Sequence, residues 1–253
     1  MTKELEVAIK AAKEAGEILK TRFQGFNPTS LKADESLVTE SDKLSEQKVI
    51  SIIKKNFPYH SIRAEESGFS DEKSESTWVI DPLDGTTNYA RKVPIFSVSI
   101  ALMERDRLKL GLVYDPVHDQ LFSTEKNMGT KLNNQRVQVS DITDLGKTMV
   151  GYARPSVHKG EFANIFSRVE QVTRTPKILG SMALQLAYVA AGILDATVLL
   201  KPSSWDAAAG TLLVQEAGGK VTDLQGNPWS LDSKDILATN GKIHKEILEI
   251  INR

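Results

Sequence analysis

The segment TWVIDPLDGTTN, residues 77–88, decides how the rest of the chain is interpreted. Its first half is apolar and rich in β-branched and aromatic residues, which predicts a short buried strand. Asp81 and Asp84 follow at once, only three positions apart, and no basic residue occurs after them until Arg91. Two carboxylates this close repel one another, and a cation supplied from outside would relieve that repulsion. The segment therefore predicts a metal site at the end of a strand, where ligand sites of layered α/β proteins lie.

The residues that follow favour a phosphate ligand beside the metal. Asp84, Gly85 and Thr86 are typical of the first turn of a helix, where unpaired backbone N–H groups bind anions and a glycine allows close approach. Mg²⁺ binds one or two carboxylates together with phosphate oxygens, so it suits both features. Taken alone, the same residues are equally compatible with Asp84 as a helix cap and Asp81 as a turn residue.

Two other acidic segments strengthen the metal interpretation. RAEESG, residues 63–68, contains Glu65 and Glu66, and SSWDAAAG, residues 203–210, places Asp206 at the start of an alanine-rich segment. Alone, the glutamates would be interpreted as solvated side chains and Asp206 as a carboxylate favoured by a helix dipole. The small residues after Asp206 predict close packing of its helix, which would hold this carboxylate firmly.

Hydrophobic periodicity predicts a mixed α/β chain with two different halves. Helices are expected over 3–23 and from about Ser41, which Thr39 or Ser41 can cap, with a polar loop over 26–37 between them. Three strands over 97–104, 108–114 and 120–125 predict an antiparallel meander. The second half alternates between strands and helices: strands are expected over 148–153, 177–180, 194–200, 220–223 and 235–240, and helices over 161–172, from Ser181, over 205–219 and from about Lys242.

This alternation predicts layered sheets covered by helices. We expect one compact unit over residues 1–253, divided into a metal- and phosphate-binding half (1–143) and a half that completes the active site (144–253), because no flexible linker separates them. The longest apolar stretch, 183–200, is interrupted by Gln185, Gly192 and Asp195, so we interpret it as a buried helix, a turn and a strand rather than a membrane span.

Composition excludes several classes of function. The 253 residues carry a formal net charge of −1, so nucleic acid is not the expected partner. The chain has no cysteine, which excludes disulfides, thiolate metal sites and cysteine nucleophiles. The N-terminal residues are too charged for a signal peptide, and a cytoplasmic location is expected.

Four segments resemble those of a known family. WVIDPLDGTTNYARKVPIFSVSIAL and WDAAAGTLLVQEAGG are similar to the two signature segments of the inositol monophosphatase family, and LVTESD and RAEES are similar to two further segments. The family comprises Mg²⁺-dependent, lithium-sensitive phosphatases related to fructose-1,6-bisphosphatase. The resemblance covers essentially the whole chain and implies a five-layer α-β-α-β-α sandwich. It also implies a homodimer, because family members commonly form one.

The resemblance assigns roles to individual residues. The implied metal ligands are Glu65, Asp81, Asp84, Asp206 and the main-chain carbonyl of Leu83. Asp81 would bridge two Mg²⁺ ions, a third and weaker ion would lie near Glu65 and Glu66, and Mn²⁺ could substitute. Gly85 and Thr86 would bind the phosphate through backbone N–H groups. Asp42 and Thr86 would orient the attacking water, with the ion on Glu65 activating it.

Substrate specificity is less constrained. The implied substrate-binding residues are Asp84, Gly180, Ser181, Lys201, Arg154, Arg174 and Asp206. Inositol-specific members of the family carry a glutamate at the position of Leu199, so this chain departs from the inositol pattern. Tyr152, Arg154 and Arg174 could form a basic wall for a second phosphate.

Four functions therefore remain open. The first is a phosphomonoesterase that acts on inositol 1-phosphate or related sugar and polyol phosphates. The second is a fructose-1,6-bisphosphatase, alone or as a dual activity. The third is a phosphatase for histidinol phosphate, NADP or a 3′-phosphonucleotide. The fourth, from a different class, is a regulatory binding protein with the same fold.

Overall fold

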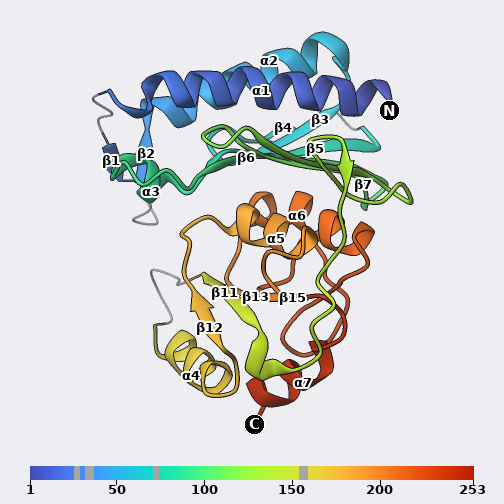
Figure 1. Cartoon of the computed structure of the whole chain (residues 1–253). Helices are drawn as coiled ribbons and strands as arrows, with labels where there is room; N and C mark the ends of the chain where they lie inside the picture. Colours follow the sequence, from blue (N-terminus) through green and yellow to red (C-terminus); the bar gives the residue numbers. More distant parts are fainter. Residues whose placement is uncertain (26–28, 32–36, 71–73, 154–158) are drawn as a thin grey trace.

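The computed structural model describes residues 1–25, 29–31, 37–70, 74–153 and 159–253. They form five layers in the order α-β-α-β-α, which confirms the predicted fold class (Figure 1). Two helices cover the outer face of an eight-stranded sheet, two helices separate this sheet from a five-stranded one, and two more cover the far side (Figure 1). Within the described ranges, no helix is long and apolar enough to cross a membrane.

The first layer consists of α1 (Lys3–Phe23) and α2 (Glu40–Asn56), as predicted. Thr2 caps α1 by accepting a hydrogen bond from the backbone N–H of Leu5 at 3.3 Å. Thr39 is the N-cap of α2, and its side chain and that of Asp42 form a capping box. Both helices bury one face against the eight-stranded sheet, because their apolar residues recur at helical spacing.

The eight-stranded sheet has the order β10-β9-β8-β7-β6-β5-β3-β4. Its centre is the predicted meander of β6, β7 and β8, and β3 pairs with β5 in parallel. The four short strands of two to four residues were not predicted, because so few residues show no period. The strands are β3 (Ser61–Ala64), β4 (Gly68–Ser70), β5 (Ser76–Asp84), β6 (Ser97–Glu104), β7 (Arg107–Asp115), β8 (Gln120–Glu125), β9 (Lys131–Leu132) and β10 (Gln135–Arg136).

Both faces of this sheet are buried, and β7 shows how the sequence achieves it. Leu110, Leu112 and Tyr114 point toward α1 and α2, in the first hydrophobic core. Val113 points the other way, into a core shared with α5 (Met182–Ala190) and α6 (Ser204–Glu216). A strand that is covered on both sides is apolar at nearly every position, which is why these segments show no polar face.

The five-stranded sheet has the order β12-β11-β13-β15-β14 and is mixed, with parallel pairs on both sides of β11. Its outer face packs on α4 (Lys159–Glu170) and α7 (His244–Ile251) in a third core. The strands are β11 (Met149–Ala153), β12 (Thr175–Lys177), β13 (Ala196–Leu200), β14 (Lys220–Thr222) and β15 (Asp235–Thr239). The predicted strand over 177–180 is therefore wrong by about two residues.

The predicted polar loop over 26–37 is wrong in part. β1 (Thr29–Leu31) and β2 (Leu37–Thr39) pair as a separate two-stranded sheet, and residues 26–28 and 32–36 lie outside the described residues. A three-residue strand that pairs locally carries no recognisable alternation. The division of the chain near residue 143 stays a prediction, although the eight-stranded sheet ends at Arg136 and the five-stranded sheet begins at Met149.

Replacement of Gly111 tests the contact between the first sheet and α6. A Cβ at this position would lie 2.6 Å from the carbonyl oxygen of Ala209, so Gly111→Ala must push β7 and α6 apart. We expect the free energy of unfolding to fall by about 1–3 kcal/mol in urea denaturation. Gly160→Ala is the control, because no heavy atom of the described residues beyond its own stretch of helix lies within 4 Å of its added Cβ. Equal stability of the two variants would contradict this account of the packing.

Candidate functional site

Three carboxylates from two distant segments meet between the eight-stranded sheet and α6. Asp81 and Asp84 come from the end of β5, and Asp206 comes from the first turn of α6. One oxygen of each lies within 4.8 Å of the others, and the described part of the chain contains no other such group of three or more His, Cys, Asp or Glu side chains. Asp81 and Asp84 are buried, and Asp206 is partly exposed.

The end of β5 is irregular in the way this arrangement requires. Residues three apart on a regular strand point to opposite faces of the sheet. The pairing register between β5 and β6 shifts between Asp81 and Asp84, and Asp81 Oδ1 accepts a hydrogen bond from the backbone N–H of Leu83 at 2.9 Å. This turn at Pro82 places both carboxylates on the side of α6. The proline and the two-residue spacer are therefore part of the site.

Burial and mutual repulsion make this cluster electrostatically unfavourable. Burial, followed by the charges of Glu65, Asp84 and Asp206, raises the pKa of Asp81 well above its ordinary value. Burial also raises the pKa of Asp84. Partial burial, followed by the charge of Asp84, raises the pKa of Asp206 to about 8. A divalent cation would offset the repulsion between these groups.

Glu65 lies next to this cluster but outside the group of three. It directly follows β3, and its backbone N–H donates to the carbonyl of Ile80 at 3.2 Å. Of the neighbouring charges, that of Glu65 raises the pKa of Asp81 most. The structure thus places Glu65 near the first of the three carboxylates.

One face of α2 holds the surrounding segments in place, and two residues of this face were not predicted from the sequence. The buried carboxylate of Glu46 accepts hydrogen bonds from the backbone N–H groups of Glu66 and Ser67, each at 2.8 Å. The hydroxyl of Ser45 donates to the carbonyl of Pro82 at 2.7 Å. Both residues lie one turn after Asp42 on the same helix face, so helical spacing from Asp42 could have found them.

Asp42 and Thr86 are paired, as the resemblance implies. Thr86 Oγ1 lies 3.0 Å from Asp42 Oδ1 and 3.1 Å from the carbonyl oxygen of Leu83. The other oxygen, Asp42 Oδ2, accepts from the backbone N–H of Thr39 at 2.8 Å. Burial raises the pKa of Asp42 above its ordinary value.

Asp206 repeats this arrangement at the start of α6. Like Asp42 in α2, it occupies the third position of its helix, and its Oδ2 accepts from the backbone N–H of Ser203 at 2.7 Å. In both cases one oxygen is fixed by the helix terminus, so the other can face the site. The capping box therefore determines where each carboxylate points.

Asp84 joins the two halves of the chain. Its Oδ2 accepts from the backbone N–H of Ala183 at 2.8 Å and from the Ser181 hydroxyl, and its Oδ1 accepts from the N–H of Met182 at 3.0 Å. These donors form the start of α5, so Asp84 lies at the positive end of that helix. A carboxylate offers about four acceptor positions, so Oδ1 retains capacity for a cation.

Two glycines allow the chain to pass closely beside α3 (Thr86–Ala90). Gly85 has φ of 98°, and a Cβ there would lie 3.0 Å from the carbonyl oxygen of Ile95 and 3.2 Å from that of Gly180. Gly180 has φ of 75° and lies against Asn88, whose amide donates to the carbonyl oxygen of Leu179 at 2.7 Å. The predicted phosphate-binding and substrate-binding segments therefore touch.

Leu199 and Tyr152 lie on strands of the five-stranded sheet, and Arg174 directly precedes another of its strands. Leu199 is fully buried in the core between the sheets, so it offers no apolar wall to a ligand. Tyr152 is buried in the third core against Phe166, which makes its assignment to a basic wall wrong. Arg174 precedes β12, whereas Gly180 follows it, and Arg154 lies outside the described residues.

The donors at this site fit a hard divalent cation. All of the candidate ligands are oxygens, and oxygen donors suit Mg²⁺, Ca²⁺ and Mn²⁺. Burial, followed by the charge of Asp84, raises the pKa of Asp206, and a divalent cation would offset the negative charge here. The acidic cluster could therefore hold a metal ion.

Comparisons with known proteins agree with the geometry. The family model described as "Inositol monophosphatase family" matches residues 1–253. The Nus factor SuhB of Pasteurella multocida is 39% identical, over 98% of this chain and 95% of that protein. The fructose-1,6-bisphosphatase/inositol-1-monophosphatase of Thermotoga maritima is 35% identical, over 98% and 95%. The crystal structure of the extragenic suppressor protein suhB from Bartonella henselae has a TM-score of 0.97 at 32% identity and covers 100% of this chain and 99% of that one.

Removal of the Glu46 charge should weaken metal binding, although Glu46 is not itself a proposed metal ligand. Glu46→Gln keeps the shape of the side chain but replaces one acceptor oxygen by an amide that cannot accept from Glu66 or Ser67. We expect a loss of about tenfold in Mg²⁺ affinity, the size typical of groups that support metal ligands, measured by isothermal titration calorimetry. Gln47→Ala, on the exposed face of α2, is the control. Unchanged affinity in Glu46→Gln would show that the loop holds its position without this clamp.

The stability of the metal-free chain should depend on pH with a definite sign. The pKa of Asp206 is about 8 in the folded chain but about 4 in an unfolded one. The folded state therefore keeps a proton that the unfolded state releases, and stability falls as pH rises through this range. Because Mg²⁺ competes with these protons, it should raise the melting temperature more at pH 8 than at pH 5.5. Asp206→Asn should flatten the pH dependence, and an equal Mg²⁺ effect at both pH values would contradict the argument.

Proposed function

We propose, because the chain belongs to the inositol monophosphatase family, that it hydrolyses phosphate monoesters of sugars or polyols, such as inositol 1-phosphate, with Mg²⁺. The observation that carries the proposal is the group formed by Asp81, Asp84 and Asp206, with ligand oxygens within 4.8 Å of one another. Burial raises the pKa of all three acids, and neighbouring charges add to this at Asp81 and Asp206. Such a buried acidic group is costly for stability, and a metal-dependent reaction explains its presence.

Two to three Mg²⁺ ions are proposed for the site, and Mn²⁺ could replace them. The proposed ligands are Glu65, Asp81, Asp84, Asp206 and the carbonyl oxygen of Leu83. Bound Mg²⁺ supplies Lewis-acid chemistry, because it makes water more acidic and offsets charge on a phosphate ester. Sensitivity to lithium stays a prediction from the family resemblance.

Asp42 and Thr86 are proposed to hold the proton of the attacking water. The Thr86 hydroxyl has one hydrogen to donate, and its distance of 3.0 Å supports donation to Asp42 Oδ1. The lone pairs of Thr86 are then free to accept from a water molecule, and the carbonyl of Leu83 is left available as a ligand. Burial raises the pKa of Asp42, so this carboxylate accepts a proton more readily.

The backbone at the start of α3 is proposed to bind the phosphate. The first N–H groups of a helix have no partner within the helix, so those of Gly85 and Thr86 can donate to phosphate oxygens. The close approach permitted by the missing Cβ of Gly85 supports this assignment. Gly180 and Ser181 would lie beside the substrate hydroxyls, because Ser181 donates to Asp84 and Gly180 contacts Gly85.

Alternatives for the substrate stay open. The Thermotoga maritima relative carries both fructose-1,6-bisphosphatase and inositol-1-monophosphatase in its name, which supports a dual activity here. Histidinol phosphate, NADP and 3′-phosphonucleotides are further possible substrates of a phosphatase with this site. Inositol-specific members of the family carry a glutamate at the position of Leu199. Leu199 is fully buried and apolar, so it cannot replace that glutamate as a hydrogen-bond acceptor for an inositol hydroxyl.

A regulatory role is the second candidate function. Relatives with the name Nus factor SuhB, one of them 39% identical, favour it. The retained carboxylates and the Asp42–Thr86 pair favour catalysis instead. The formal charge of −1 gives no general attraction to nucleic acid. A homodimer and a cytoplasmic location stay predictions, and exposed apolar side chains such as Ile178 and Ile193 are compatible with a dimer.

Phosphate release from a panel of sugar, polyol and nucleotide phosphates tests the proposal. We expect turnover with Mg²⁺, none after chelation with EDTA, and recovery when Mg²⁺ or Mn²⁺ is restored. Thr86→Ala and Asp42→Asn should each lower kcat by at least about a hundredfold, as expected for lost proton transfer, and should change Mg²⁺ affinity little. Full activity in EDTA would exclude the metal mechanism. Near-normal kcat in either variant would exclude the assigned pair.

A further inference from the structure

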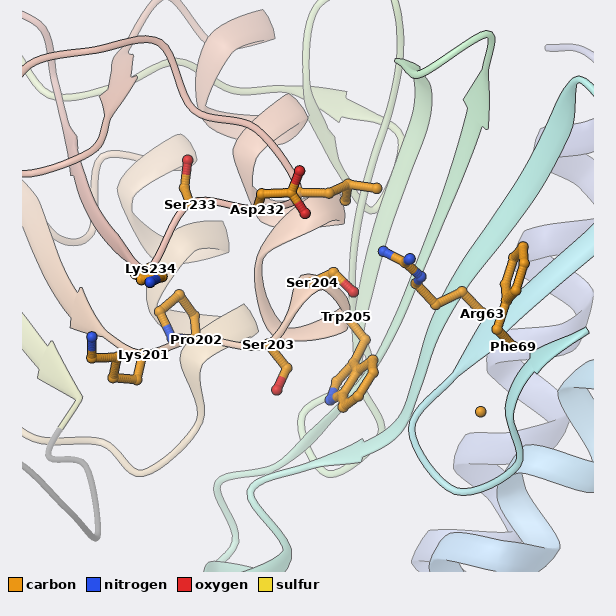
Figure 2. Close-up of a pocket in the computed structure, with 12 residues that line it drawn as sticks. Arg63, Phe69, Lys201, Pro202, Ser203, Ser204, Trp205, Asp232, Ser233 and Lys234 are labelled. Atoms are coloured by element: carbon orange, nitrogen blue, oxygen red, sulfur yellow. The ribbon is translucent and has the colours of Figure 1, made fainter. Parts of the chain in front are cut away.

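A cleft of about 670 Å³ lies between the two halves of the chain. One wall comes from the first sheet and includes Arg63 and Phe69 (Figure 2). The opposite wall comes from residues 201–205, which lead into α6, and from residues 231–234, which lead into β15 (Figure 2). Neither the metal site nor the phosphate site proposed above uses the side chains of this cleft, apart from Lys201.

The cleft adjoins the carboxylate cluster. Arg63 pairs in register with Val79, which faces the core around α6. Glu65 and Asp81 each lie two residues further along these two strands, which is about 7 Å of extended chain. On the other wall, residue 205 directly precedes Asp206. A ligand whose phosphate lies at the carboxylates can therefore extend into this cleft.

Positive charge predominates in the cleft. Arg63, Lys201 and Lys234 line it together with a single acid, Asp232. None of the three basic side chains forms an ion pair with a carboxylate of the described residues. The guanidinium of Arg63 points into the cleft (Figure 2), and its Cζ lies 5.7 Å from the centroid of the Phe69 ring, within the range of a cation–π interaction.

Lys201 and Lys234 are held side by side despite their like charges. The last register pair of β13 and β15 is Leu200 with Asp235, so the two lysines are the next opposed pair. The backbone N–H of Lys201 donates to the carbonyl of Lys234 at 2.8 Å. Like charges in opposed positions are destabilising. Lys201 itself has a left-handed backbone conformation, with φ of 54°.

We propose that this cleft is an anion subsite that binds a second anionic group of the substrate, a phosphate or a carboxylate. The proposal rests on the proposed function, because the first phosphate would lie at the carboxylate cluster. The two sites differ in chemistry. The carboxylates repel a bare phosphate unless a cation lies between them, whereas Arg63, Lys201 and Lys234 bind an anion directly. The chain therefore distinguishes the two ends of a doubly charged substrate.

Steady-state kinetics on a matched pair of probes tests the subsite. Fructose 1,6-bisphosphate carries the second anion and fructose 1-phosphate lacks it. We expect Arg63→Gln and Lys234→Gln each to lower the ratio of the two kcat/KM values by about tenfold, as for one charge-assisted hydrogen bond. The loss should appear in KM for the bisphosphate, and it should shrink at high salt. Lys234 is exposed, so its replacement does not disturb the core.

Lys131→Gln removes an exposed charge on β9, far along the sheet from the cleft, and serves as the control. If Arg63→Gln and Lys234→Gln each lower kcat/KM by the same factor for fructose 1,6-bisphosphate and for fructose 1-phosphate, the proposed subsite is overturned. If the wild-type chain releases phosphate from neither fructose probe, the proposed function is decided separately by the wider panel of sugar, polyol and nucleotide phosphates. Calorimetric titration with fructose 1,6-bisphosphate and Mg²⁺ then decides the subsite alone: binding that Arg63→Gln weakens supports it, and the absence of such binding overturns it.

Discussion

Repulsion between buried carboxylates is the constraint on which the rest of the structure depends. Asp81, Asp84 and Asp206 raise the cost of folding because burial disfavours their charged forms and each lies close to the others. Helix termini offset part of this cost. Asp84 accepts hydrogen bonds from the start of α5, Asp206 lies in the first turn of α6, and Asp42 lies in the first turn of α2. The pKa values of Asp42, Asp81, Asp84 and Asp206 nevertheless stay above their ordinary values. The helix termini therefore orient these carboxylates but do not fully offset the cost of burying their charge. This remaining negative charge would favour the binding of a divalent cation at this position.

The same hydrogen bonds make the site a product of the whole fold. Asp84 belongs to the first sheet, yet its carboxylate accepts hydrogen bonds from the backbone N–H groups of Met182 and Ala183, about a hundred residues further along the chain. Glu46 lies on α2 in the outer helical layer, and its carboxylate accepts a hydrogen bond from the backbone N–H of Glu66, in the segment that follows β3. The carboxylates therefore come together only when the outer helices, the sheet and the middle helices are all in place. Local opening of either half would separate the acids and remove the metal site.

The sequence predicted the layers and the acids, because both rest on signals within single segments. Long periodic stretches fixed α1, α2 and the meander, and the spacing of Asp81, Asp84 and Gly85 indicated a metal beside a phosphate. The resemblance then added Asp42 and made Glu65, already noted in RAEESG, a metal ligand. Short strands such as β3 and β4 were missed, since pairing with neighbours, rather than their own composition, defines them. Helical spacing from Asp42 indicates the position of Glu46, but its partners, the backbone N–H groups of Glu66 and Ser67, lie 20 and 21 residues away and no local pattern identifies them. Tyr152 was misplaced for a related reason: which side of a strand faces the site depends on the packing of two sheets.

The site combines buried carboxylates with a more exposed cleft, and this contrast suggests how relatives in one family can differ in substrate. The carboxylates lie on β5 and on the first turn of α6, and buried hydrogen bonds fix them from several sides. The walls of the cleft come instead from β3 and β4 at the edge of the first sheet, from the start of α6, and from the connections that contain Lys201 and Asp232. A substitution in these connections changes charge and shape without disturbing the packing of any layer, whereas a substitution at Asp84 or Glu46 affects several elements at once. Chemistry is thus carried by the rigid part of the fold, and selectivity by a part that can vary. We therefore expect the substrate preference of this chain to depend on the basic residues of the cleft. The carboxylates, which the family resemblance also implies, should contribute less to that preference.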